Sequence, residues 1–166
     1  KKIREFNKNI ILLRKDFIID EIQLYEAKFS GADMVLLILA LTGEKRTKEL
    51  IKTAKEIGLE VLLEVHDENE MQIALNLDVN FIGVNNRDLK TLKVDINTSE
   101  KLSKYIIKDK IFVSESGFNN IDDIMKMLNL GYNTFLIGTY FMSSNNQSNT
   151  LNNLCKTINM RLENLQ

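Results

Sequence analysis

Short apolar runs alternate with longer amphipathic segments along the whole chain. Runs in which consecutive residues are apolar predict strands buried on both faces, as in parallel sheets, and the segments between them predict crossover helices. The pattern therefore predicts an α/β fold with a parallel sheet. Its six expected strands are 9–14, 33–39, 60–65, 80–85, 110–114 and 134–138.

The expected helices have recognisable ends. Thr42 is expected to cap the helix that stops at Gly58, and Asp67 the helix after it, since a side-chain oxygen at the N-cap accepts a hydrogen bond from a free backbone N–H. The last expected helix carries apolar residues at helical spacing. We expect Cys155, which lies on that stripe, to be buried in the core.

Polar residues at the strand ends favour one architecture over another. Five of them each follow or end a different expected strand, at its C-terminal end. An open doubly wound sheet gathers its ligand at one switch point, whereas a closed barrel places functional groups on the loops after every strand. The distribution predicts a barrel mouth. Its residues are Lys15, Glu64, Asn85, Glu115 and Thr139.

Composition and charge exclude several functional classes. The 166 residues are enough for one domain, and 22 basic against 23 acidic residues give a net charge of -1, which offers no electrostatic case for binding nucleic acid or an anionic membrane. One cysteine predicts a reducing cytoplasm. No apolar run reaches the roughly 18 residues that a membrane span needs.

Two glutamates lie where water cannot solvate them freely. Glu64 and Glu115 end apolar strands, and burial raises a carboxyl pKa toward values that suit a general acid or base. With Lys15 at a third strand end they form a mixed set whose pKa values would diverge. For Glu64 alone, a structural pair with a neighbouring lysine remains the alternative, and for Lys15 alone a solvated charge at the strand end.

Glycines at two strand ends suggest an anion site. Gly117 and Gly138 permit close backbone approach, and exposed N–H groups there attract anions, as in the loops after strands seven and eight of a barrel. Simple turns are the alternative. Residues 85–88 (NNRD) offer amide and guanidinium donors for a polyol or carboxylate, and a plain loop is the alternative. His66, the one histidine, lacks partners at zinc-ligand spacing; we expect it to fill a loop position, and the alternative is that the strand continues and His66 shares the face of Glu64 two residues earlier.

Several motifs together resemble one enzyme family. They are LRKDFI (13–18), LEVHDE (63–68), GVNNRDL (83–89), VSESG (113–117) and LIGT (136–139). In this order they resemble indole-3-glycerol phosphate synthase of tryptophan biosynthesis. The resemblance implies a (β/α)8 TIM barrel whose strands 3 to 8 occupy residues 1–166 as a single partial domain. A complete barrel has about 250 residues, and the missing Met at position 1 also suggests that an N-terminal part is absent.

The resemblance also implies a reaction, a lyase activity without metal or organic cofactor. The enzyme closes the ring of 1-(2-carboxyphenylamino)-1-deoxyribulose 5-phosphate to give indole-3-glycerol phosphate, with loss of carbon dioxide and water. By motif, Lys15 resembles the general acid and Glu64 the carboxylate that assists dehydration. Asn85 and Glu115 resemble residues that orient the substrate hydroxyls and the catalytic lysine.

The family's substrate-binding residues also have counterparts here. Ser116, Gly117, Gly138 and Thr139 match the phosphate loops, Phe17, Leu36, Leu62 and Leu89 the anthranilate pocket, and Arg87 a nearby cation. The family's first strand, with a Glu and a catalytic Lys, has no match.

Other functions stay open at this point. One is another phosphate-binding barrel enzyme, such as phosphoribosylanthranilate isomerase or a pentose-phosphate epimerase, although an epimerase needs several metal-binding His and Asp residues. Another is a non-catalytic phosphate-binding fragment or partner subunit. A six-strand piece would also expose two strand edges, so we expect self-association.

Overall fold

The computed structural model describes residues 1–163. In chain order its elements are α1 (Lys2–Phe6), β1 (Leu13–Arg14), α2 (Glu21–Phe29), β2 (Met34–Ile38), α3 (Leu39–Glu56), β3 (Glu60–Val65), α4 (Glu68–Leu75), β4 (Phe81–Asn85), α5 (Asn97–Leu102), the 3₁₀ turn Ser103–Tyr105, β5 (Ile111–Glu115), α6 (Ile121–Asn129), β6 (Thr134–Leu136), α7 (Thr139–Met142) and α8 (Gln147–Glu163). All six expected strands are present.

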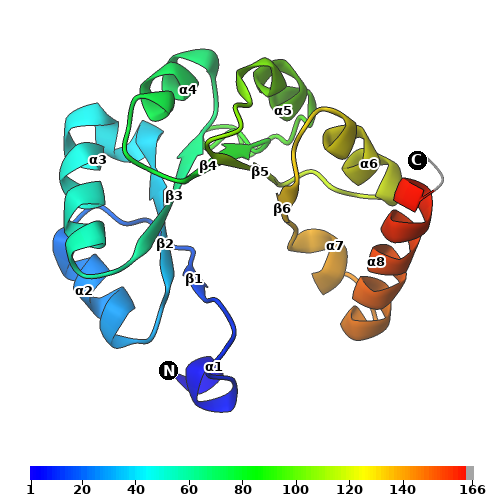
Figure 1. The fold of residues 1–166 in the computed structure, drawn as a ribbon, viewed down its shortest axis with the longest axis horizontal. Coiled ribbons are helices and arrows are strands. Elements are labelled where there is room, and N and C mark those ends of the chain that lie inside the picture. The colour runs from blue at the N-terminus through cyan, green and yellow to red at the C-terminus, as the bar shows by residue number, and fades with distance from the viewer. Residues whose placement is uncertain (164–166) are drawn as a thin grey trace.

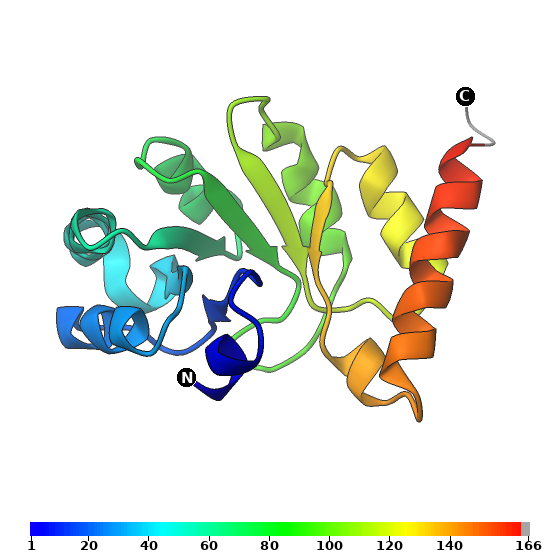
Figure 2. The ribbon, with the colours of Figure 1, turned by 60° about the horizontal axis from the view of Figure 1, so that its bottom comes forward.

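The sheet is parallel throughout, and its strands follow chain order from β1 to β6. Every connection therefore moves one strand in the same direction, whereas a doubly wound sheet reverses direction at its switch point. The sheet curls into an arc with α2 to α6 and α8 on its outer side (Figure 1). These helices run along it from α2 at one end to α8 at the other (Figure 2). This arrangement confirms six consecutive βα units of a (β/α)8 barrel.

Two apolar layers pack against the sheet, one on each face. The larger layer packs the outer face of the sheet against the helices, and includes Leu37, Leu63 and Ile82. The smaller layer lies on the inner face, where the alternation of side chains along each strand directs the next residues inward. Its buried members are Leu36, Ile38, Leu62 and Val113. The inner-facing residues further along the same strands stand above this layer, at the C-terminal edge of the sheet.

The strand before Lys15 is shorter than predicted. Arg4 donates hydrogen bonds to the carbonyls of Lys8 at 2.7 Å and Ile10 at 2.8 Å, and Asp33 accepts from the N–H of Leu12 at 2.8 Å. These side chains satisfy backbone groups that a longer strand would have paired with its neighbour. Only Leu13–Arg14 is therefore strand.

The helix ends agree with the sequence in part. Asp67 accepts a hydrogen bond from the N–H of Glu70 and caps α4, as predicted. Gly43 breaks α3 directly after Thr42, with a φ of 69° and a ψ of 165°, but the expected N-cap is wrong because the Thr42 hydroxyl donates back to the Ile38 carbonyl at 3.2 Å. The prediction that Cys155 is buried is also wrong. Leu154 is the buried residue of α8 and Ile158 packs partly against the core, while Cys155 is exposed.

Within residues 1–163, no helix has both the length and the hydropathy needed to cross a membrane.

Candidate active site

A lysine and two buried carboxylates meet at the C-terminal edge of the sheet. Lys15 directly follows β1, Glu64 lies in β3 and Glu115 ends β5. Lys15 Nζ lies 3.2 Å from Glu64 Oε2 and 3.4 Å from Glu115 Oε2. Both glutamate side chains are 1% exposed, while the lysine side chain is 40% exposed. The three strand-end residues therefore form one cluster, and its ammonium group lies on the solvent side.

Asn85, the last residue of β4, fixes one of these carboxylates. Its Nδ2 donates to Glu64 Oε1 at 3.0 Å, while its Oδ1 accepts from the N–H of Arg87 at 3.0 Å. Because both ends of the amide are occupied, the side chain has one favoured orientation. Asn85 thus holds Glu64 in place from the neighbouring strand.

His66 also belongs to this cluster. Its Nε2 lies 3.1 Å from Glu64 Oε1 and its Nδ1 lies 3.2 Å from Glu70 Oε2. The expectation that it fills a loop position is therefore wrong. The Glu70 carboxylate on α4 accepts the backbone N–H of His66 at 2.8 Å and also contacts Nδ1, so Nε2 faces Glu64 as a close charge contact without hydrogen-bond geometry. The spacing of an acidic residue two positions before and four positions after the histidine was the available sequence signal.

The pKa values of the two buried glutamates are shifted in opposite directions. Burial alone would raise the pKa of Glu64, but the His66 and Asn85 contacts and the Lys15 charge hold that pKa well below its usual value. Burial and the neighbouring Glu64 charge raise the pKa of Glu115 to about 7, with Lys15 opposing them. Neither Glu115 oxygen has a hydrogen-bond partner within residues 1–163. Near neutral pH the site can hold one ionised and one protonated carboxyl group.

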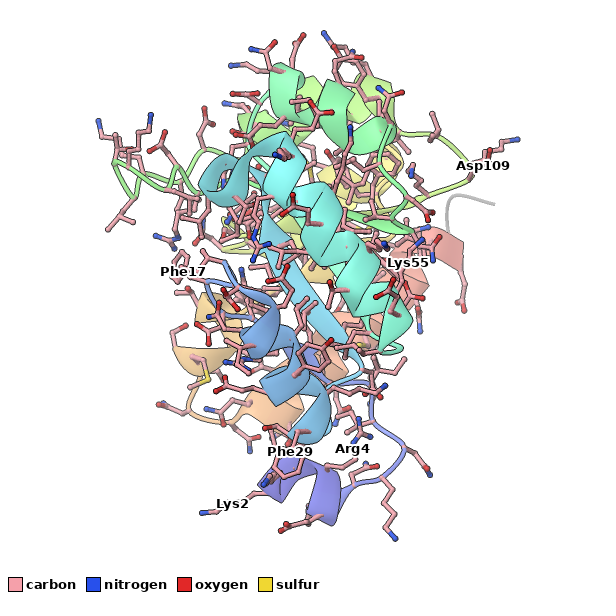
Figure 3. The ribbon with its side chains drawn as sticks, turned by 90° about the vertical axis from the view of Figure 1, so that its left-hand side faces the viewer. Lys2, Arg4, Phe17, Phe29, Lys55 and Asp109 are labelled. Carbon is pink, nitrogen blue, oxygen red and sulfur yellow. The ribbon has the colours of Figure 1, made fainter. Side chains whose placement is uncertain are left out.

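An open cavity of about 370 Å³ lies over this cluster. Phe17 stands at its rim, 62% exposed, on the side of the molecule opposite Lys55 and Asp109 (Figure 3). The sequence did not single out three of the lining residues, Asp16, Ile38 and Leu92. Leu92 lies in a polar loop without periodic pattern, so no signal distinguished it. The full lining is Lys15, Asp16, Phe17, Leu36, Ile38, Glu64, Asn85, Arg87, Leu89, Leu92 and Ser116.

Leu62 is the one predicted ring-pocket residue that does not line this cavity. It packs in the inner apolar layer with Leu36, beneath the cavity floor. Its contribution is to support that floor.

A second cavity of about 130 Å³ adjoins the first, and Arg87 and Ser116 line both. Within residues 1–163, no backbone or side-chain acceptor takes the N–H of Gly117 or Gly138. Ser116 has a φ of 65° and Gly117 a φ of 87°, so the backbone turns sharply at the end of β5. Free N–H groups in a small concave site suit an anion. The lining is Arg87, Ser116, Gly117, Phe118, Leu136, Ile137, Gly138, Thr139 and Tyr140.

Comparison with known proteins decides the family. The family model described as indole-3-glycerol phosphate synthase matches residues 1–154. The chain belongs to the indole-3-glycerol phosphate synthase family. The match includes every residue that lines the two cavities. It does not favour the alternatives of another phosphate-binding barrel enzyme or a non-catalytic fragment.

Relatives carrying the name indole-3-glycerol phosphate synthase agree. The chain is 55% identical to that of Caldanaerobacter subterraneus subsp. tengcongensis over 131 residues, which are 79% of this chain and 51% of the relative. It is 48% identical to that of Lachnospira eligens over 149 residues, 87% of this chain and 55% of the relative. It is 43% identical to that of Clostridium acetobutylicum over 156 residues, which are 94% of this chain and 59% of the relative. The chain thus spans about half the length of the indole-3-glycerol phosphate synthases it matches.

Proposed function

We propose that the protein carrying this chain is an indole-3-glycerol phosphate synthase, a cytoplasmic carbon-carbon lyase of tryptophan biosynthesis. Its substrate is 1-(2-carboxyphenylamino)-1-deoxyribulose 5-phosphate, and residues 1–166 are one partial barrel domain of it. The observation that carries the proposal is the cluster of Lys15, Glu64 and Glu115 beneath an apolar cavity, which adjoins a smaller cavity lined by Gly117 and Gly138.

The two cavities suit the two ends of this substrate. The anthranilate ring fits against Phe17, Leu36 and Leu89, with Leu62 supporting Leu36 from beneath. The phosphate fits the second cavity, where Ser116, Gly117, Gly138 and Thr139 supply backbone and hydroxyl donors. Arg87 lines both cavities, and this supports a cationic contact between the ring and the phosphate. The reacting carbonyl then lies near the lysine.

Lys15 serves as the acid in ring closure. The ring carbon that bears the carboxylate attacks the substrate carbonyl carbon, and negative charge develops on the carbonyl oxygen. An ammonium group at the solvent side of the cluster can protonate that oxygen, which becomes a hydroxyl group. Loss of carbon dioxide leaves its electron pair with the ring and restores aromaticity.

Glu64 and Glu115 divide the remaining work. In the dehydration step, an ionised, desolvated Glu64 can accept a proton from the carbon next to the new hydroxyl group and pass it to that hydroxyl, which then leaves as water. Glu115, 3.4 Å from Lys15 Nζ, orients the lysine. Asn85 keeps Glu64 aimed at the cavity.

The test compares the chain alone with a completed barrel, in which the N-terminal βα units of the Caldanaerobacter synthase precede the same chain. The added units supply the first strand of the family, which carries a catalytic lysine that residues 1–166 lack. Substrate is added and product is followed by indole fluorescence. The completed barrel is expected to form product, at a rate that Lys15→Ala lowers strongly. A completed barrel that melts cooperatively and forms no product would exclude the proposed activity.

A further inference from the structure

His66 lies between two carboxylates of different elements. Glu64 belongs to β3 and faces the cavity, while Glu70 belongs to α4 on the outer side of the sheet. The imidazole is close to both, at 3.1 Å and 3.2 Å, and its side chain is only 15% exposed. It therefore joins the active-site carboxylate to a group that does not line the cavity.

The charges around the imidazole favour its protonated form. In the described residues 1–163, the ionisable groups that contact it are Glu64 and Glu70, and Lys15 lies beyond Glu64. Burial alone would lower the pKa of His66, but its contacts with these two carboxylates raise that pKa to about 9. Two acidic neighbours and one imidazolium leave a single net negative charge, which Lys15 offsets.

We propose that His66 is a positioning residue, an imidazolium that keeps Glu64 ionised and oriented when Lys15 turns to the substrate, with Glu70 as its anchor. The inference rests on the proposed synthase function. Without His66, Glu64 would lose its cationic partner at the moment when Lys15 gives up its proton. A buried carboxylate with no cation beside it takes up a proton and stops acting as a base.

The anchor has a matched control on the same helical turn. Glu68 is a carboxylate of α4 that binds Lys104 at 2.9 Å and Tyr105 at 3.0 Å, away from His66. Glu70→Gln removes the charge that faces the imidazole, whereas Glu68→Gln removes a charge nearby that does not. Comparing the two separates the specific contact from a general loss of negative charge.

The first measurement needs no turnover. His66 is the chain's single histidine, so its imidazole nitrogen signals in an NMR pH titration need no assignment in the chain alone. In the completed barrel they are the signals absent from His66→Gln. The expected pKa of His66 is above 8, falling by about one or more in Glu70→Gln and unchanged in Glu68→Gln. Titration near the ordinary value of about 6.5 in both wild type and Glu70→Gln would overturn the inference.

The second measurement is the pH profile of turnover in the completed barrel. His66→Gln is expected to move the acidic limb of kcat to higher pH and to lower kcat near pH 6 by roughly tenfold, with KM changed by less than about threefold. Glu70→Gln should move the same limb by less. If the wild type forms product and the His66→Gln profile coincides with the wild-type profile, the positioning role of His66 is wrong while the synthase function stands. If a folded wild type makes no product, the synthase function fails, and the role of His66 in it fails as well.

Discussion

Gly83 of β4 lies against the carboxyl group of Glu115 at the end of β5. A methyl group on Gly83 would overlap Glu115 Oε1 and would lie 3.2 Å from Glu115 Cδ and 3.3 Å from Leu62 Cδ1. The glycine has no side chain on the inner face of the sheet, and this gives the buried carboxyl its space. A residue without a side chain thus determines where the carboxyl group that orients Lys15 lies.

Gly83→Ala tests this relationship. The added methyl group should push Glu115 away from Lys15, lower the free energy of unfolding by about 1–3 kcal/mol, and reduce turnover by more than about tenfold. In a Glu115→Ala background the same change should cost less than half as much free energy, because the colliding oxygen is gone. Chemical denaturation of the four proteins of this double-mutant cycle measures the coupling. Strictly additive effects would show that Gly83 does not make room for Glu115.

The raised pKa of Glu115 makes stability depend on pH. Between about pH 4.5 and 7 the folded state holds a proton on Glu115 that the unfolded state has released, so the free energy of unfolding should fall as pH rises through this window. Glu64 has a lowered pKa, and its stabilisation is present above its unfolded pKa and is lost only as pH falls below that value.

Glu115→Gln should therefore flatten this decline. The neutral amide resembles the protonated acid, so the variant should be more stable than wild type at pH 8 by an amount of the order of 1 to 3 kcal/mol. Urea denaturation at pH 8 measures the difference in stability, and the slope is measured between pH 5 and pH 6.5, because the raised pKa of His66 adds a decline of its own above about pH 6.5. Glu44→Gln, which changes an exposed ion pair with Lys48, is the control and should leave the slope unchanged. A wild-type slope retained in Glu115→Gln would assign the pH dependence to other groups.

The sequence predicted the elements well where burial alone determines them. The strand 60–65 has the predicted bounds, because each residue after Glu60 is buried and apolar or lies in the site. The prediction failed at the sheet's first strand, where Arg4 and Asp33 bind the backbone of the segment before it. The apolar pattern of a segment does not show whether side chains elsewhere in the sequence take up its backbone hydrogen bonds.

The candidate site was predictable for a similar reason. Parallel strands bring their C-terminal ends to one edge, so Lys15, Glu64 and Glu115 had to lie near one another. The side-chain contacts within the site depend on local conformation, which the spacing of residues in the sequence does not determine. The position of His66 depends on how Glu70 folds back from α4, and the depth of Leu62 depends on the alternation of inner-face side chains.

The outer edges of β1 and β6 have no strand partner within residues 1–163. Large apolar side chains near the N-terminal end of the sheet are also exposed, among them Ile11 and Phe29. We predict that the chain expressed alone associates through these surfaces. Sedimentation over a range of concentrations should show dimers or larger species, and the completed barrel should show less association. A monodisperse, cooperatively melting monomer of the chain alone would contradict this prediction.

The most direct test of the central claim is single-turnover indole fluorescence in the completed barrel, comparing wild type with Lys15→Ala. Removing the ammonium that contacts Glu64 and Glu115 should slow product formation by at least about 100-fold. Lys48→Ala, which removes an exposed ammonium paired only with Glu44 in residues 1–163, should leave the rate within about twofold. If Lys15→Ala forms product at the rate of Lys48→Ala, Lys15 is not the acid of ring closure and the proposed site is wrong.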